Sequence, residues 1–154
     1  MASPAKPPEI ASGRFRAIPL VLLDVDVVLD VLGRREPFYS DSAAVLAACE
    51  AGLCRGLIAA HTVTTLFYLL AKHEGARIAH AHLQDLLQIV DVATVDGEVI
   101  RRALGGSVED FEDEVQATAA ARAGAEYIVT RNLAHFSGGL VQALAPAEFL
   151  PLVS

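Results

Sequence analysis

The stretch DFEDEVQATAAARAGAEYIVTRN, residues 110–132, predicts a helix that leads directly into a strand. Four of its first five residues are acidic, and like charges three or four positions apart on a helix repel each other by roughly 0.2–0.5 kcal/mol per pair. The alanine-rich middle predicts a helix at 108–123, Gly124 is a typical helix terminator, and the residues after it predict a strand at 126–130. Such crowding indicates either that the helix terminus favours acids or that a positive group lies there.

The rest of the chain alternates between strand and helix in the same way. Short apolar runs and amphipathic spacing predict strands at 18–24 and 56–60, helices at 41–52, 62–73, 76–89 and 96–104, a strand or extended connector at 89–95, a last strand at 139–146 and a closing helix at 146–153. Strands that alternate with helices pair in parallel, with helices on both faces of the sheet. We therefore expect an α/β fold, a three-layer α/β/α sandwich with a central, mostly parallel sheet.

Composition indicates one globular domain with a short tail. The chain has 154 residues, of which 53% are hydrophobic, enough to bury a substantial core. Residues 1–17 mix proline, serine and basic residues without an apolar stretch, which predicts a flexible tail rather than a signal peptide. The domain is expected at 18–154. The only cysteines, Cys49 and Cys54, lack zinc-site spacing and are expected to be reduced, buried thiols.

Charge argues against two classes of protein, basic nucleic-acid binders and membrane-spanning proteins. The net charge of −7 disfavours binding of nucleic-acid phosphates by the bare protein, although acids that bind cations would reverse the local field. The longest apolar run, residues 18–32, is interrupted by Asp24, Asp26 and Asp30, which excludes a membrane helix. We expect a cytoplasmic protein.

Two acids lie where a parallel sheet places its ligands. Asp24 ends the first predicted strand, and Asp113 lies one helical step from Asp110 on the same face of the predicted helix. Ligands of such sheets bind beyond the carboxyl ends of the strands, and Mg²⁺ or Mn²⁺ prefers carboxylate oxygens. The structural alternatives are a capping box between Ser107 and Asp110, and a helix cap provided by Asp24 or Asp26.

Three segments resemble, in order and spacing, the PIN-domain ribonucleases, and most closely the VapC-like toxins of prokaryotic toxin–antitoxin pairs. They are LLDVDVVLDVLGRREPFYSDSAAVL, TLFYLLAK and DFEDEVQATAAARAGAEYIVTRNLAHF. The resemblance covers roughly residues 20–150. It implies a compact α/β/α sandwich whose acids bind Mg²⁺ or Mn²⁺ and hydrolyse RNA. It also implies a homodimer and a cognate antitoxin as partners.

The resemblance assigns the metal-binding residues. Asp24 matches the first-strand acid and Asp113 the late-helix acid, so these two are the expected catalytic residues. Asp110 matches an acid often found one turn before the late-helix acid, and Asp26 replaces the usual asparagine; both are further candidate metal ligands.

Two positions depart from the family pattern. The acid expected on helix 62–73 falls near Thr65, and the last acid falls at Asn132 or at His135. Asn132 can still orient a water or offer its carbonyl oxygen. Arg131, beside it, is a candidate for contact with a phosphate or for a surface ion pair. Thr65, Asn132 and Arg131 are therefore supporting candidates only.

The expected function is metal-dependent hydrolysis of RNA. One alternative is a PIN-like binding or regulatory module that has lost catalysis, because acids are missing at Thr65 and Asn132. Another is a haloacid-dehalogenase-like phosphatase that uses the DVDV stretch, residues 24–27, although the Gly-Thr that should follow is absent. Four histidines show no convincing metal-site spacing, and positions on solvated helix faces explain most of them: His61, His73, His80 and His82.

Overall fold

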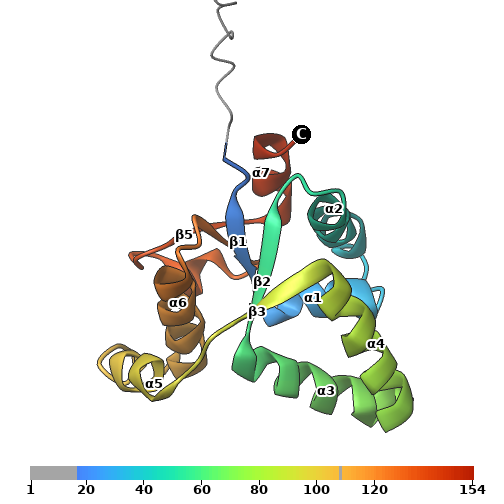
Figure 1. Ribbon diagram of the computed structural model, residues 1–154, viewed down its shortest axis with the longest axis horizontal. Coiled ribbons are helices and arrows are strands. Elements are labelled where there is room, and N and C mark those ends of the chain that lie inside the picture. The colour runs from blue at the N-terminus through green and yellow to red at the C-terminus, as the bar shows by residue number, and fades with distance from the viewer. Residues whose placement is uncertain (1–16, 108) are drawn as a thin grey trace, which may run out of the picture.

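The computed structural model describes residues 17–107 and 109–154 (Figure 1), so the predicted tail lies outside the described residues except for Ala17. Five strands form one parallel sheet in the order β3-β2-β1-β4-β5. Their bounds are β1 Leu20–Leu23, β2 Arg55–Ala59, β3 Val90–Ala93, β4 Tyr127–Val129 and β5 Gln142–Leu144.

Helices cover both faces of the sheet. In Figure 1, α5 and α6 lie on one side, and α1 to α4 lie on the other with α7. The bounds are α1 Val25–Leu32, α2 Tyr39–Glu50, α3 Ala60–Glu74, α4 Ala76–Ile89, α5 Gly97–Ala103, α6 Phe111–Ala123 and α7 Pro146–Phe149, with 3₁₀ helices η1 Leu133–Phe136 and η2 Leu150–Leu152. The predicted α/β/α sandwich is confirmed. No described helix has the length and apolar character needed to span a bilayer.

The core has two halves because successive strand residues point to opposite faces. In β1, Val21 and Leu23 belong to the cluster under α1 to α4, whereas Leu22 belongs to the cluster under α5 and α6. All three side chains are fully buried. A strand buried on both faces has an unbroken apolar sequence, which is why this stretch is recognisable.

The strand order places a switch point beside β1. The chain passes from β1 to β2 and β3 on one side, and then returns to β4 and β5 on the other. The backbone N–H of Asp24 donates to the Val129 carbonyl at 3.0 Å, which joins the carboxyl ends of β1 and β4. Ligands of open parallel sheets bind at such points.

The start of α6 lies three residues later than the sequence predicts, and α1 lies in a stretch for which no helix is predicted. α6 begins at Phe111 with Asp110 as its N-cap residue, so Ser107 lies before the helix and Asp113 lies in its first turn rather than beyond it. α1 follows β1 with only Asp24 between them. The start of α1 is not visible in the sequence, because both elements are apolar and the change from strand to helix period falls within one apolar run. The terminator Gly124 is confirmed in the left-handed conformation.

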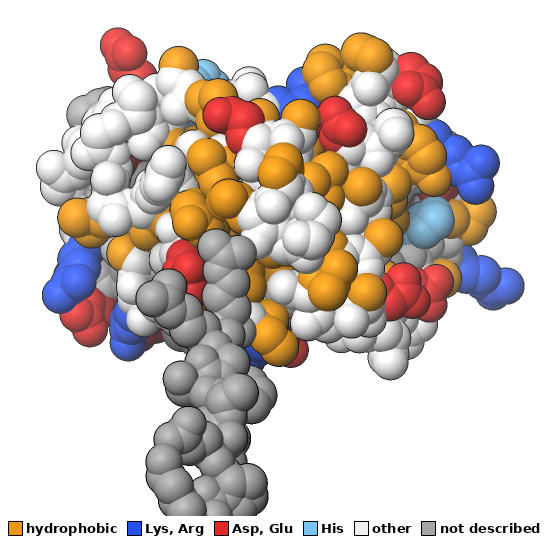
Figure 2. All heavy atoms as spheres, turned by 90° about the horizontal axis from the view of Figure 1, so that it is seen from above, with side chains coloured by type: hydrophobic (Ala, Val, Ile, Leu, Met, Phe, Trp, Pro, Cys, Tyr) orange, Lys and Arg blue, Asp and Glu red, His pale blue; other side chains and the backbone are white. Residues whose placement is uncertain are grey.

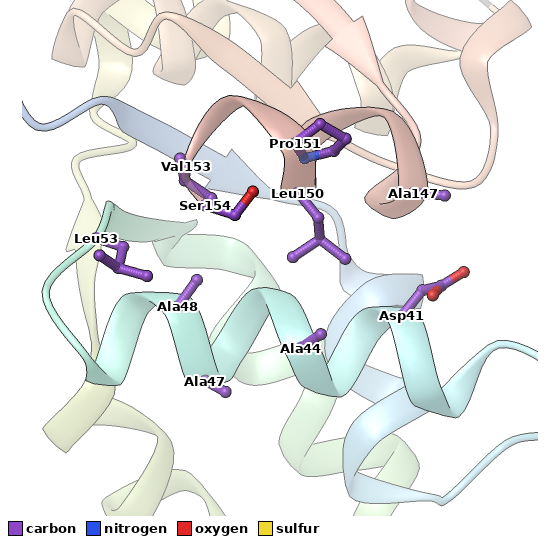
Figure 3. A pocket seen from close by; sticks show the side chains of 10 residues that line it. All are labelled: Asp41, Ala44, Ala47, Ala48, Leu53, Ala147, Leu150, Pro151, Val153 and Ser154. Carbon is purple, nitrogen blue, oxygen red and sulfur yellow. The ribbon is translucent and has the colours of Figure 1, made fainter.

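The amino-terminal ends of the strands, opposite the switch point, lie under a largely apolar surface. Figure 2 shows hydrophobic side chains over much of the middle of this face, with acidic side chains among and around them and basic side chains at its rim. A hollow of about 590 Å³ lies between α2 and the C-terminal segment (Figure 3). Asp41 contributes its only carboxylate side chain. Cys49 and Cys54 lie nearby at the end of α2 and before β2, free and buried as expected, with their sulfur atoms 3.4 Å apart.

Candidate metal centre

Asp24 lies at the switch point between β1 and β4. It is 3% exposed. Its Oδ1 accepts a hydrogen bond from Gln116 Nε2 at 3.0 Å, and its Oδ2 accepts one from Thr130 Oγ1 at 2.8 Å. Burial raises the pKa of the Asp24 carboxyl, against the opposing effect of these two hydrogen bonds. The fold therefore holds this carboxylate in one orientation from two different elements.

Gln116 connects Asp24 to a second acid. Its Nε2 also lies 3.0 Å from both carboxylate oxygens of Glu112, one turn earlier on α6. Glu112 Oε1 in turn lies 2.9 Å from Nε2 of His61. His61 is in the first turn of α3, directly after β2. These contacts bring side chains from beyond β1, from α3 and from α6 to one place.

Asp113 completes a group of three neighbouring acids. Burial, followed by the negative charge of Glu112, raises the pKa of Asp113 to about 6. Burial alone would also raise the pKa of Glu112, but hydrogen bonds from His61 and Gln116, with the charge of His61, lower it. Among residues 17–107 and 109–154, no lysine or arginine forms an ion pair with Asp24, Glu112 or Asp113.

A second cluster lies on the outer side of Asp113. Asp110, Asp113 and His135 each offer a ligand atom, and these atoms lie within 4.8 Å of one another. His135 Nδ1 is 3.0 Å from Asp113 Oδ2. Asp113 therefore belongs both to this outer cluster and to the inner group with Asp24 and Glu112.

The other predicted ligand, Asp26, pairs with a predicted supporting residue. Asp26 lies in the first turn of α1 and accepts a hydrogen bond from Asn132 Nδ2 at 2.8 Å. The backbone N–H of Asn132 donates to Thr130 Oγ1 at 2.9 Å. Thr130 also contacts Asp24. The Asp26–Asn132 pair therefore lies next to Asp24 but does not contact Gln116.

Thr65 and Arg131 have partners within the fold. Thr65 is exposed on α3, and its hydroxyl donates to the His61 carbonyl of the preceding turn at 3.3 Å. Arg131 Nε and Nη2 donate to the two oxygens of the fully buried Asp30 at 2.7 and 3.2 Å. The guanidinium also stacks 3.9 Å from the ring centroid of Phe38. Arg131 thus forms an ion pair with a buried acid, not with a surface group.

Sequence reasoning missed Glu112, Gln116 and His61. His61 has no metal-site spacing in the sequence, whereas the structure places it against Glu112. Two signals were available. Glu112 and Gln116 are four residues apart and therefore neighbours on one helix face, and His61 follows a predicted strand at the ligand-binding edge.

The side chains around Gln116 fit an oxygen-preferring divalent cation. Glu112, Asp113 and Asp24 supply carboxylates, which Mg²⁺ and Mn²⁺ prefer. Three buried polar atoms of this region have no hydrogen-bond partner among the described residues: Gln116 Oε1, His61 Nδ1 and Thr62 Oγ1. Because buried polar groups are almost always satisfied, these atoms favour a bound ion or bound water as their missing partner.

Comparison with known proteins gives a family and a fold. The family model described as PIN domain matches residues 20–134. No curated protein matches the chain. Among solved structures, VapC20 of Mycobacterium tuberculosis, described as a Sarcin-Ricin loop cleaving toxin, is 15% identical with a TM-score of 0.62, over 78% of this chain and 96% of that one.

Two VapBC structures give similar values. The DNA-bound VapBC of Salmonella typhimurium is 16% identical with a TM-score of 0.62, over 84% of this chain and 99% of its own. VapBC-1 of nontypeable Haemophilus influenzae is 14% identical with a TM-score of 0.61, over 83% and 98%. At such low identities these similarities establish the fold.

Proposed function

Since this chain belongs to the PIN domain family, we propose that it is a metal-dependent endoribonuclease of the toxin–antitoxin type. The observation that carries the proposal is the group of carboxylates at the switch point, where Asp24 and Asp113 lie close enough for their charges to interact. Nothing basic pairs with this group within the described part of the chain except His61 and His135. A fold tolerates such uncompensated charge when it binds a cation.

Asp24 and Asp113 are the proposed ligands of Mg²⁺ or Mn²⁺, with Asp110 and Asp26 as further candidates. A divalent ion at this place would supply a water of lowered pKa and offset negative charge on an RNA phosphodiester. The chain's own contribution is orientation. Gln116 and Thr130 hold the two oxygens of Asp24, and His135 holds one oxygen of Asp113.

The proposed partners follow from the same family membership. They are an RNA substrate, a cognate antitoxin protein and a second copy of the chain, in the cytoplasm. The VapBC similarity supports an antitoxin partner. The family assignment removes the phosphatase alternative.

The test is cleavage of RNA by the purified protein. We expect cleavage of a total RNA pool with Mn²⁺ and none with EDTA. Asp24→Asn and Asp113→Asn should each reduce the rate by about a hundredfold or more. Glu126→Gln, which removes an exposed acid at the opposite end of β4, is the control. Equal cleavage by the two Asp variants and wild type would refute the proposal.

A second candidate function is a PIN-domain module without catalysis. It is favoured by one observation: Thr65 and Asn132, where the family places acids, are a threonine bonded to its own helix and an amide that donates to Asp26. Titration calorimetry separates the two functions. Absence of Mn²⁺ binding, together with absence of RNA cleavage, would establish the non-catalytic module.

A further inference from the structure

The helix that should supply an acid to the metal centre has none in the right place. The resemblance puts that acid near Thr65, whose hydroxyl instead donates to its own helix. The only acid of α3 is Glu74 at its far end. The proposed metal centre therefore receives no carboxylate from α3.

Glu112 provides a carboxylate beside the first turn of α3. It belongs to α6 but contacts His61 in the first turn of α3 at 2.9 Å. Gln116 Nε2 lies 3.0 Å from both Glu112 oxygens and 3.0 Å from Asp24 Oδ1. The carboxylates of Glu112 and Asp24 are thus arranged around a common point, now filled by a neutral amide donor.

The amide itself provides a second and independent sign of a ligand. Gln116 is completely buried, and its Oε1 has no partner among the described residues. A buried carbonyl oxygen without a hydrogen bond destabilises the fold, because it has lost its water without gaining a partner. Nε2 of this amide faces the two carboxylates, so Oε1, on the same carbon, lies next to them, where a hard cation or its coordinated water could satisfy it.

We propose that Glu112 is a ligand of the divalent cation together with Asp24 and Asp113, and that His61 is a positioning residue that holds Glu112. The inference rests on the proposed function, because it concerns the same metal centre. Glu112 keeps half of its side-chain surface exposed, so a hydrated cation can reach it from solvent. Glu112 thereby replaces the acid that Thr65 does not provide.

The test is Mn²⁺ binding by metal-stripped, full-length protein, measured by titration calorimetry. Glu112→Gln keeps the shape of the side chain and removes its charge, and it should weaken Mn²⁺ binding by about tenfold or more. Glu126→Gln also removes one negative charge, but at the amino-terminal end of β4, and should leave the Mn²⁺ affinity within about twofold of that of wild type. Circular dichroism must show that both variants are folded. Unchanged binding by folded Glu112→Gln would overturn the proposal.

His61 requires a conservative pair of variants. His61→Gln retains a donor that can reach Glu112, whereas His61→Ala does not. We expect His61→Gln to bind Mn²⁺ within about threefold of wild type and His61→Ala to bind about tenfold more weakly. Equal affinity of the two variants would show that His61 does not position Glu112.

The result is separable from the proposed function. If Asp24→Asn removes Mn²⁺ binding and Glu112→Gln does not, the result supports the metal centre and contradicts the role of Glu112 as a ligand. If wild type binds no Mn²⁺, both fall.

Discussion

Three charged side chains of the proposed metal centre shift the pKa of Asp113. Burial raises its pKa first, and the charges of Glu112 and Asp24 raise it further, while His135 lowers it; the result is about 6. A carboxyl with a folded pKa above its unfolded value stabilises the protein fully below the unfolded value of 3.8. That stability is lost as the pH rises through about 6.

Asp113→Asn should therefore stabilise the metal-free protein at pH 7 by about 1–2 kcal/mol. The gain should shrink as the pH falls towards 4, where the wild-type carboxyl is protonated. Thermal unfolding in EDTA between pH 4 and 7 measures both effects. Added Mn²⁺ should raise the melting temperature of wild type but not of the variant. Destabilisation of the variant at pH 7 would instead show that Asp113 is structural.

Arg131 stabilises the fold and is not part of the proposed metal centre. Its guanidinium compensates the fully buried Asp30 through two hydrogen bonds. Removing one partner of a buried ion pair leaves an uncompensated charge.

Arg131→Ala should lower the free energy of unfolding by roughly 3–5 kcal/mol, as measured by urea denaturation. Arg55→Ala is the matched control, because Arg55 and Asp91 form an exposed pair at 3.9 Å that contributes at most about 1 kcal/mol. Similar losses in the two variants would contradict the assigned role of the Arg131–Asp30 pair.

At the scale of elements, the apolar pattern predicts strands and long helices better than their ends. The range predicted for α4 is that observed, Ala76–Ile89, because Gly75 with a positive φ separates it from α3. The sequence does not show where α1 begins, because Asp24 alone separates this helix from an equally apolar strand. The start of α6 was placed too early, because capping residues precede it at several positions.

The candidate site was predictable only where one element decides the position. Asp24 is marked by a strand end, and Asp113 by its spacing within one helix. The contact of His61 with Glu112 joins residues 51 positions apart and depends on how α3 and α6 approach each other. No periodicity within a single helix contains that information.

The packing of α2 on the sheet depends on a glycine in β2. A Cβ atom at Gly56 would lie 2.9 Å from both Cys49 Sγ and Val90 Cγ1. Gly56→Ala should lower the free energy of unfolding by about 1–3 kcal/mol through overpacking, as measured by chemical denaturation. Combining it with Cys49→Ala should recover part of the loss. A Gly56→Ala variant as stable as wild type would show that α2 and β3 can shift apart without cost.

At the scale of the whole molecule, we expect self-association through α3 and α4. The family resemblance motivates this, and Tyr68 on α3 is 66% exposed. Light scattering at micromolar concentration should give a dimer, and Tyr68→Glu should shift it towards a monomer. Leu140→Glu is the control, since Leu140 is 88% exposed but borders α5 and α6. A monomeric wild type, or equal effects of the two variants, would contradict the expected interface.

The pairing of β1 with β4 also affects folding during synthesis on the ribosome. Val21 pairs with Tyr127, so β1 emerges more than a hundred residues before its partner. At roughly 5–20 residues per second, this delay lasts roughly 5–20 seconds. Throughout that time Asp24 has been translated but Asp113 and its helix have not yet folded against it. A nascent chain, or a product truncated before α6, therefore carries only part of the acidic group and should be unable to bind the cation.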